Sequence, residues 1–210
     1  GSGYRNPDDI VTGEYPDGRD VDERFFAACE LYKATGDKKY HKAIKETTFI
    51  TLPRGLGWAS VGMYGIVEYL SLEDKDEEVA EVLTQMLKEQ AEKAEEEAAS
   101  DGYSCTLGDT YPWGSNMSVA NNGMLLLFAS DLVGTDTAGL AGLQLDYILG
   151  RNANSYCFVT GYGSLSPENP HHRPSMVAGS AMKGMLIGGP DNALEDPYAK
   201  AVLAENAPAK

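Results

Sequence analysis

The feature that most constrains the fold of this chain is a pattern that occurs three times: a helix predicted to be buried is followed by one predicted to be exposed. In the first pair, apolar residues recur at helical spacing from Val21 to Tyr32 and define one face of a helix. The sequence TGD at 35–37 supplies a helix stop and a restart. A short and mostly polar segment follows at 37–47, as expected of an outer helix that lies on a first one.

The second and third pairs repeat the scheme. Residues 58–72 are apolar nearly all round, which predicts a buried helix that opens at Trp58, while 77–98 carry apolar residues at helical spacing among acids and lysines. The run GMLLLFA within 116–133 predicts burial on every side, and 140–149 follow after the turn GTD. Strand-like alternation is confined to a short YCFVTGY near Tyr156. We therefore predict an all-α chain of inner apolar and outer amphipathic helices.

A long region without helix signals begins at Arg151 and is rich in Gly, Pro, Asn and Ser. Such a long loop in a compact domain is usually functional. It contains SLSPENPHHRPS, whose three prolines stiffen the backbone around His171, His172 and Arg173. These side chains offer hydrogen-bond donors suited to hydroxyls or a carboxylate. A polar surface loop without a ligand is the alternative interpretation.

Both tryptophans are predicted at the same end of successive inner helices, Trp58 after GLG and Trp113 after TYP. Two aromatic rings at a shared rim would stack on sugar faces, whereas packing inside the core is the alternative.

Spacing selects no acid–base pair among the isolated acids Asp20, Asp22, Glu23, Asp109 and Asp146. Asp22 and Glu23 have a simpler role in the first turn of a helix, where carboxylates favour the positive end of the dipole.

Composition excludes several partners. The formal net charge of -15 would repel a phosphate backbone, so we expect no nucleic-acid partner, and a neutral or cationic ligand fits better. No apolar run approaches the roughly 20 residues of a membrane span, so we expect no membrane partner. An N-terminal signal with a basic start and an apolar middle is lacking, so we expect the chain to carry no secretion signal of its own. Three cysteines cannot all pair with one another and lack metal-ligand spacing, which predicts buried thiols: Cys29, Cys105 and Cys157.

Several long motifs closely resemble glycoside hydrolase family 9, the cellulases. LDYILGRNANSYCFVTGYGSLSPENPHHRPS (145–175) and GMLIGGPDNALEDPYAKAVLAENAPAK (184–210) resemble the C-terminal part of that catalytic domain. FFAACELYKATGDKKY, LGWASVGMYG and YPWGSNMSVANNGMLLLFASDL resemble its helices, so the resemblance covers essentially the whole chain. It implies an (α/α)6 barrel, of which this chain supplies about half as three helix hairpins plus a long loop-rich C-terminal region. Residues 1–210 are then part of a single catalytic domain that lacks its N-terminal part and its last segment.

The resemblance implies an extracellular endo-β-1,4-glucanase that hydrolyses internal β-1,4-glucosidic bonds of cellulose or related β-glucans with inversion. His171 and Arg173 match the family's active-site loop, which binds glucosyl hydroxyls beside the cleavage point, and His172 is predicted to bind substrate beside them. Trp113, in PWGSN, matches a cleft aromatic, and Trp58 is a weaker match. No cofactor is implied, apart from the calcium that supports loops in many family members and that the sequence does not place.

The chain departs from the family pattern at two loop positions and at both reacting carboxylates. Cys157 stands where a serine or similar residue is usual, and Leu165 where a lysine, arginine or asparagine is usual, which predicts weaker loop support rather than loss of the site. The family's base lies in an Asp-Ala-Gly-Asp motif that this chain lacks, and its acid follows the segment that matches 207–210. Glu205 lies ahead of that position and is not assigned the role. We therefore expect this chain to be inactive alone.

Two alternatives remain open. The chain could be a catalytically silent carbohydrate-binding helical domain, or a helical scaffold without sugar affinity. Expected partners are a β-glucan polysaccharide and either accessory modules or the missing remainder of the barrel. Half a ring would leave the flanks of inner helices uncovered, so we expect the isolated chain to associate or to unfold readily.

Overall fold

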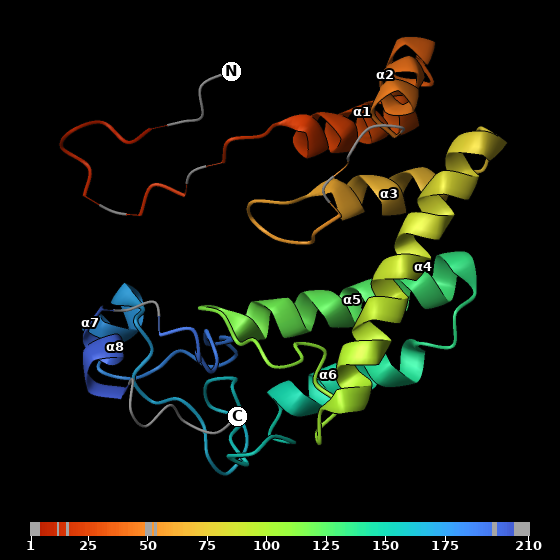
Figure 1. The fold of residues 1–210 in the computed structure, drawn as a ribbon. Coiled ribbons are helices and arrows are strands. Elements are labelled where there is room, and N and C mark those ends of the chain that lie inside the picture. Colours follow the sequence, from red (N-terminus) through yellow and green to blue (C-terminus); the bar gives the residue numbers. More distant parts are fainter. Residues whose placement is uncertain are drawn as a thin grey trace. The chain divides into compact units, whose positions relative to one another are not determined.

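The computed structural model describes residues 5–11, 13–15, 17–48, 52, 54–194 and 197–203 (Figure 1). Within these ranges the chain is helical, and its only β pairing consists of two isolated bridges. The helices are α1 (Val21–Thr35), α2 (Lys38–Thr48), α3 (Gly62–Leu70), α4 (Glu77–Ser100), α5 (Ser115–Val133), α6 (Ala138–Ile148), α7 (Arg173–Ala178) and α8 (Pro197–Leu203). The all-α prediction and the three successive hairpins are confirmed.

The chain divides into two compact units, which are described separately below. The first comprises Gly1–Gln90 with Asp131–Gly134, and the second comprises Ala91–Ser130 with Thr135–Lys210. None of the helices in the described ranges is both long and apolar enough to cross a bilayer.

In the first unit, α1 packs against both α2 and α3. The helix α1 ends at Gly36, which adopts a φ of 65° and donates its N–H to the carbonyl of Tyr32 at 2.8 Å, as the TGD stop predicts. The close approach of α1 and α3 depends on Gly65, because a β-carbon there would lie 2.6 Å from Cδ1 of the buried Phe25. Glycine at this position therefore permits the helix contact on which the unit is built.

The helix α3 begins at Gly62, so the prediction that it opens at Trp58 is wrong. The N–H of Gly57 donates to the carbonyl of Ser60 at 2.8 Å, and the N–H of Gly55 donates to Oγ of Ser60 at 2.9 Å. These bonds close a tight turn that carries Trp58 at its tip, ahead of the helix. The spacing of apolar residues extended across this turn and gave no sign of it.

The helix α4 follows its prediction closely. Its apolar residues at helical spacing are all buried: Val79, Leu83, Met86, Leu87, Ala91 and Ala94. The acids and lysines between them lie on the other faces, as expected of an amphipathic outer helix.

In the second unit, α5 and α6 approach each other at Gly123, where a β-carbon would lie 3.3 Å from Cβ of Gln144. The prediction that GMLLLFA is buried on every side is wrong within the described structure, because Met124 and Leu127 are 39% and 51% exposed. Leu125, Leu126 and Ala129 are buried. The helix therefore has one covered face and one apolar face that the described residues leave exposed.

The region after Arg151 is irregular apart from α7 and α8, so the prediction of a long region without helices is wrong at these two segments. The run near Tyr156 forms no strand and instead makes one antiparallel bridge, between Val159 and Leu186. Phe158, next to the bridge, joins the buried cluster of this unit, whose other members are Cys105, Tyr111, Val119, Tyr147 and Ile148.

All three cysteines are free and buried, so the prediction of buried thiols is confirmed. Burial raises the pKa of the Cys29 thiol far above its usual range, and burial also raises the pKa of Cys105. Both thiols therefore stay protonated and act as small apolar groups within their cores.

Candidate functional site

The histidine-containing loop starts from a closed base in the second unit. The N–H of Cys157 donates to the carbonyl of Leu165 at 2.9 Å, so the two residues that depart from the family pattern lie side by side. Gly163 reaches a φ of 77° between them, and a β-carbon there would lie 2.8 Å from Cβ of Cys157. The backbone thus supports the loop base without a contribution from the side chain of Leu165, which is 55% exposed.

The segment expected to be only a loop contains the helix α7, which begins at Arg173. His172 is its N-cap residue: the imidazole Nδ1 accepts the N–H of Ser175 at 3.4 Å and lies 2.9 Å from Oγ of the same residue. The Ser175 hydroxyl oxygen in turn accepts the N–H of Met182 at 3.0 Å. Pro174 sits in the first turn, where its missing N–H is not needed. His172 therefore holds the loop together, in addition to any role toward a ligand.

A cavity of about 900 Å³ lies against this loop. One wall is the loop itself, from Ser166 to His172, and the other is Met185 to Gly188; Tyr156 also lines the cavity. The volume lies within the roughly 300–1,000 Å³ of small-molecule sites. The loop contributes most of the polar groups and Met185 to Ile187 contribute apolar ones, a combination that suits a ligand with both C–H surface and hydroxyls.

A second cavity of about 520 Å³ shares the segment Glu168 to His171 with the first. Its other wall comes from Ser175, Met176 and Gly179 to Ala181. His171 therefore stands between two cavities, whereas Arg173 is exposed and lines neither of them. Glu168 and Asn169 line both cavities and were not singled out from the sequence, although they lie only three and two residues before His171.

The wall Met185 to Gly188 is fixed to the beginning of α5. The N–H of Asn116 donates to the carbonyl of Gly188, and its side-chain Nδ2 donates to the carbonyl of Ile187, both at 3.0 Å. The Ser115 hydroxyl donates to the carbonyl of Pro190 at 2.6 Å. Trp113 precedes this junction and is 74% exposed, so packing in the core is not its role. It is not among the residues that line the cavities.

Trp58 lies in the first unit and is 55% exposed, so it is not a core residue either. The turn that carries it is tied to α1, because the N–H of Val61 donates to Oδ2 of the buried Asp22 at 2.8 Å. Since Trp58 and Trp113 belong to different units, their shared rim stays a prediction.

The isolated acids have mainly structural surroundings. Asp22 lies in the first turn of α1 as predicted and also receives the first N–H ahead of α3, while Asp20 pairs with Arg24 at 3.9 Å on the surface. Glu23 differs: its Oε2 is buried without a hydrogen-bond partner among the described residues, and burial raises the pKa of its carboxyl above the ordinary value. Asp109 and Asp146 are exposed.

No group of three or more His, Cys, Asp or Glu side chains within the described ranges could hold a metal ion. The donor set for calcium is therefore not found there, and the calcium expectation stays unplaced. Glu205 and the segment matched at 207–210 lie outside the described residues.

Comparison with protein families gives a match over nearly the whole chain. A family model described as glycosyl hydrolase family 9 matches residues 2–205. A xyloglucan-specific endo-beta-1,4-glucanase of Bacteroides ovatus is 36% identical over 200 residues, which cover 89% of this chain and 34% of that protein. A cellodextrinase of Butyrivibrio fibrisolvens is 30% identical over 224 residues, covering 98% of this chain and 41% of that protein.

Solved structures agree with the sequence relatives. A single mutant of the thermostable endoglucanase from Alicyclobacillus acidocaldarius superposes with a TM-score of 0.90 at 33% identity, over 98% of this chain and 40% of that chain. A metagenome-derived glycoside hydrolase family 9 endoglucanase superposes with a TM-score of 0.80 at 35% identity. This chain thus spans only about a third to two fifths of the length of these relatives.

Proposed function

Because the chain belongs to glycosyl hydrolase family 9 and has the fold of part of its (α/α)6 barrel, we propose that it is the substrate-contacting part of an endo-β-1,4-glucanase. Its substrate class is cellulose or a related β-glucan. The observation that carries the proposal is the cavity whose wall contains His171 and His172, on a loop braced by hydrogen bonds at both ends.

The cavity has the chemistry that a glucosyl residue requires. Sugar rings present apolar C–H faces and a rim of hydroxyls, and the cavity pairs Tyr156 and Leu186 with the polar groups of Glu168, Asn169 and His171. A carboxylate accepts hydrogen bonds from hydroxyls, while an imidazole and an amide can donate or accept hydrogen bonds. This combination favours a neutral polyhydroxylated ligand over an anion, in keeping with the net charge of -15.

In this proposal His171 binds glucosyl hydroxyls from the wall between the two cavities. Arg173, exposed at the start of α7, contacts the bound chain from the rim, where a planar guanidinium can donate two parallel hydrogen bonds. Trp113 and Trp58 supply exposed aromatic faces for further sugar rings.

Hydrolysis with inversion would need two more groups. It requires a carboxylic acid and a carboxylate about 6.5 to 9.5 Å apart, with room for a water molecule. Since the family motif of the base does not occur in this chain, we propose that those groups come from the remainder of a barrel and that the chain alone binds without cleaving. The alternative function, a silent carbohydrate-binding domain, has the same binding behaviour.

An extracellular location of the protein follows from a polymeric substrate and is part of the proposal.

Binding and cleavage should be measured on the same 210-residue chain. Calorimetry with cellotetraose tests binding, and reducing-sugar release from soluble β-glucan tests cleavage. We expect Arg173→Ala to weaken binding by at least about tenfold, because hydrogen bonds to charged groups contribute about 1.5–3 kcal/mol each. We expect His171→Ala to weaken binding about two- to tenfold, because a hydrogen bond between neutral groups contributes about 0.5–1.5 kcal/mol. Arg24→Ala is the matched control, since this arginine is exposed on α1 and far along the chain from the loop.

Each result has a distinct meaning. Cellotetraose binding without sugar release supports the sugar-binding role, which the proposal shares with the silent carbohydrate-binding alternative. Release that His171→Ala abolishes would show that both reacting carboxylates lie within this chain. Absence of binding, with the chain folded by circular dichroism, would favour a helical scaffold without sugar affinity.

A further inference from the structure

A further cavity of about 260 Å³ lies in the second unit at the end of α4, and is called the α4 cavity below. Ser100, the last residue of α4, forms part of its wall. None of its lining residues lines either of the two cavities at His171. The proposed function therefore makes no use of the α4 cavity, and its lining has to be interpreted separately.

Four aromatic residues line the α4 cavity: Tyr103, Tyr111, Tyr147 and Phe158. The last three belong to the buried cluster of this unit and are no more than 5% exposed, so the core holds them in place. Burial raises the pKa of Tyr111 and of Tyr147 above the usual range, so both rings stay neutral. The faces of neutral aromatic rings carry partial negative charge and attract cations.

Asp101 is the only charged residue among the described residues that line this cavity. Its Oδ1 atom accepts the N–H of Tyr103 at 2.8 Å and the N–H of Cys105 at 3.1 Å. The carboxylate makes no ion pair with any residue in the described ranges. The two backbone bonds therefore hold the carboxylate in place, while no described cation balances its charge.

The end of α4 adds to this negative potential. The carbonyl groups at a helix C-terminus carry partial negative charge, which basic side chains in the last turn can offset. The last turn of α4 has no basic residue, and Glu95, Glu96 and Glu97 lie close before Ser100. None of the described lining residues is Lys, Arg or His. These surroundings favour a positively charged ligand.

The amide of Asn152, another lining residue, has no hydrogen-bonding capacity left for a ligand. Its Oδ1 accepts the N–H groups of Asn154 and Tyr156, both at 3.2 Å. Its Nδ2 donates to the carbonyls of Tyr147 at 2.8 Å and Tyr156 at 2.9 Å. A primary ammonium carries three donors and needs several free acceptors, whereas a quaternary ammonium needs none. Aromatic residues around one negative charge therefore suit the quaternary group better.

We propose that the α4 cavity binds a small organic cation of the quaternary ammonium class. The aromatic residues surround its charged group, and Asp101 supplies the opposite charge. The volume of about 260 Å³ lies below the roughly 300–1,000 Å³ of drug-sized ligand sites, so the ligand has few heavy atoms. This binding is additional to the proposed function and does not depend on it.

The test compares choline with its neutral isostere, in which a carbon atom replaces the nitrogen. Each compound is titrated into the full 210-residue chain, and NMR follows the amide groups of Tyr103 and Cys105, which donate to Asp101. We expect choline to shift both amide signals along a saturable curve. The isostere should bind at least about tenfold more weakly, and ethanolamine, a primary ammonium, at least about threefold more weakly.

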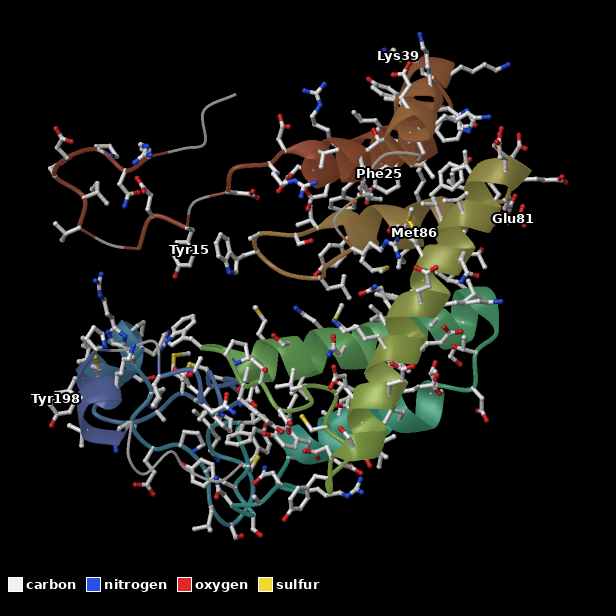
Figure 2. All side chains as sticks on the ribbon, viewed as in Figure 1. Tyr15, Phe25, Lys39, Glu81, Met86 and Tyr198 are labelled. Carbon is white, nitrogen blue, oxygen red and sulfur yellow. The ribbon has the colours of Figure 1, made fainter. Side chains whose placement is uncertain are left out.

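Variants of the chain separate the charge from the aromatic contact. Asp101→Asn keeps an oxygen that accepts the two N–H groups and removes only the charge, so choline affinity should fall at least about fivefold. Glu81→Gln is the matched control, because Glu81 is exposed near the beginning of α4 (Figure 2) and does not line the cavity. Tyr103→Leu should weaken choline binding about three- to tenfold, whereas Tyr103→Phe, which keeps the ring, should stay within about twofold.

Three results would overturn the proposal: no saturable shift with choline, equally tight binding of the isostere or of ethanolamine, or unchanged choline affinity in Asp101→Asn. If Asp101→Asn disturbs the fold, Tyr103→Leu decides, because Tyr103 is 39% exposed and contributes less to the core. Cellotetraose affinity should stay unchanged in both variants, since no residue of the α4 cavity lines the cavities at His171. Failure of choline binding and failure of sugar binding are therefore distinguishable.

Discussion

Replacement of His172 by alanine tests whether this histidine braces the loop or contacts the sugar. The imidazole caps α7 by accepting the N–H of Ser175, and Ser175 is 4% exposed and also accepts the N–H of Met182. Removal of an N-cap side chain costs about 0.5–2 kcal/mol. Since α7 has only six residues, little else in the helix compensates for the loss. We therefore expect local opening around Ser175 to become about two- to thirtyfold more frequent, with a central value near fivefold.

The assay is amide hydrogen exchange at Ser175 and Met182, followed residue by residue in the full chain. Both amides should exchange faster in His172→Ala, because both bonds depend on the position of Ser175. His172→Asn is the matched variant: asparagine is among the strongest N-cap residues and should restore slow exchange. If His172 only braces the loop, cellotetraose affinity should fall in His172→Ala and recover in His172→Asn.

Two results would refute this reasoning. Unchanged exchange in His172→Ala would show that the cap contributes nothing to the loop. Restored exchange without restored affinity in His172→Asn would show that the imidazole itself contacts the sugar, as the sequence predicted.

Two further predictions concern stability. In urea unfolding, Gly65→Ala should lower the free energy of unfolding by about 1–3 kcal/mol, because its β-carbon would lie 2.6 Å from the buried Phe25 ring. Gly142→Ala in α6 is the control: a β-carbon there meets nothing within 4 Å, so this change should raise the free energy of unfolding by about 0.5–1 kcal/mol. Glu23→Gln should stabilise the chain at neutral pH, since the raised pKa of this carboxyl means that the folded state binds its proton more tightly, and stability then falls as pH rises from 4.5 through the folded pKa. If unfolding curves between pH 4 and 8 show the same difference in stability between Glu23→Gln and the parent chain at every pH, the Glu23 prediction is contradicted.

Helical periodicity predicted the hairpins well because the buried faces of these helices follow it without interruption. In α4 every apolar residue at the expected spacing is buried, and the stop at Gly36 is where TGD placed it. The start of α3 was misjudged because Trp58 and Val61 are apolar, and hydrophobic spacing cannot separate a turn from the first turn of a helix. The hydrogen bonds of Ser60, which decide the boundary, follow from backbone geometry.

The loop shows a different limit of sequence reasoning. Its prolines were interpreted as loop stiffeners, yet Pro174 lies where helices favour proline, and His172 performs the capping task usually done by Ser, Thr, Asn or Asp. The facing wall at Met185 to Gly188 could not be inferred from local pattern, because it reaches the loop through the bridge from Val159 and through Asn116. The histidines were therefore found from residue type, while the cavity they line required the tertiary structure.

The carboxylates around the two cavities separate binding from cleavage. Glu168 is the only carboxylate among the residues that line either cavity. A single exposed carboxylate can accept hydrogen bonds from sugar hydroxyls, but inverting hydrolysis divides the roles of acid and base between two groups on opposite faces of the scissile bond. Substitution of Glu168 by Gln keeps hydrogen-bonding capacity and removes only the charge. We therefore expect Glu168→Gln to change cellotetraose affinity. Any cleavage by a completed barrel should still depend on carboxylates outside this loop.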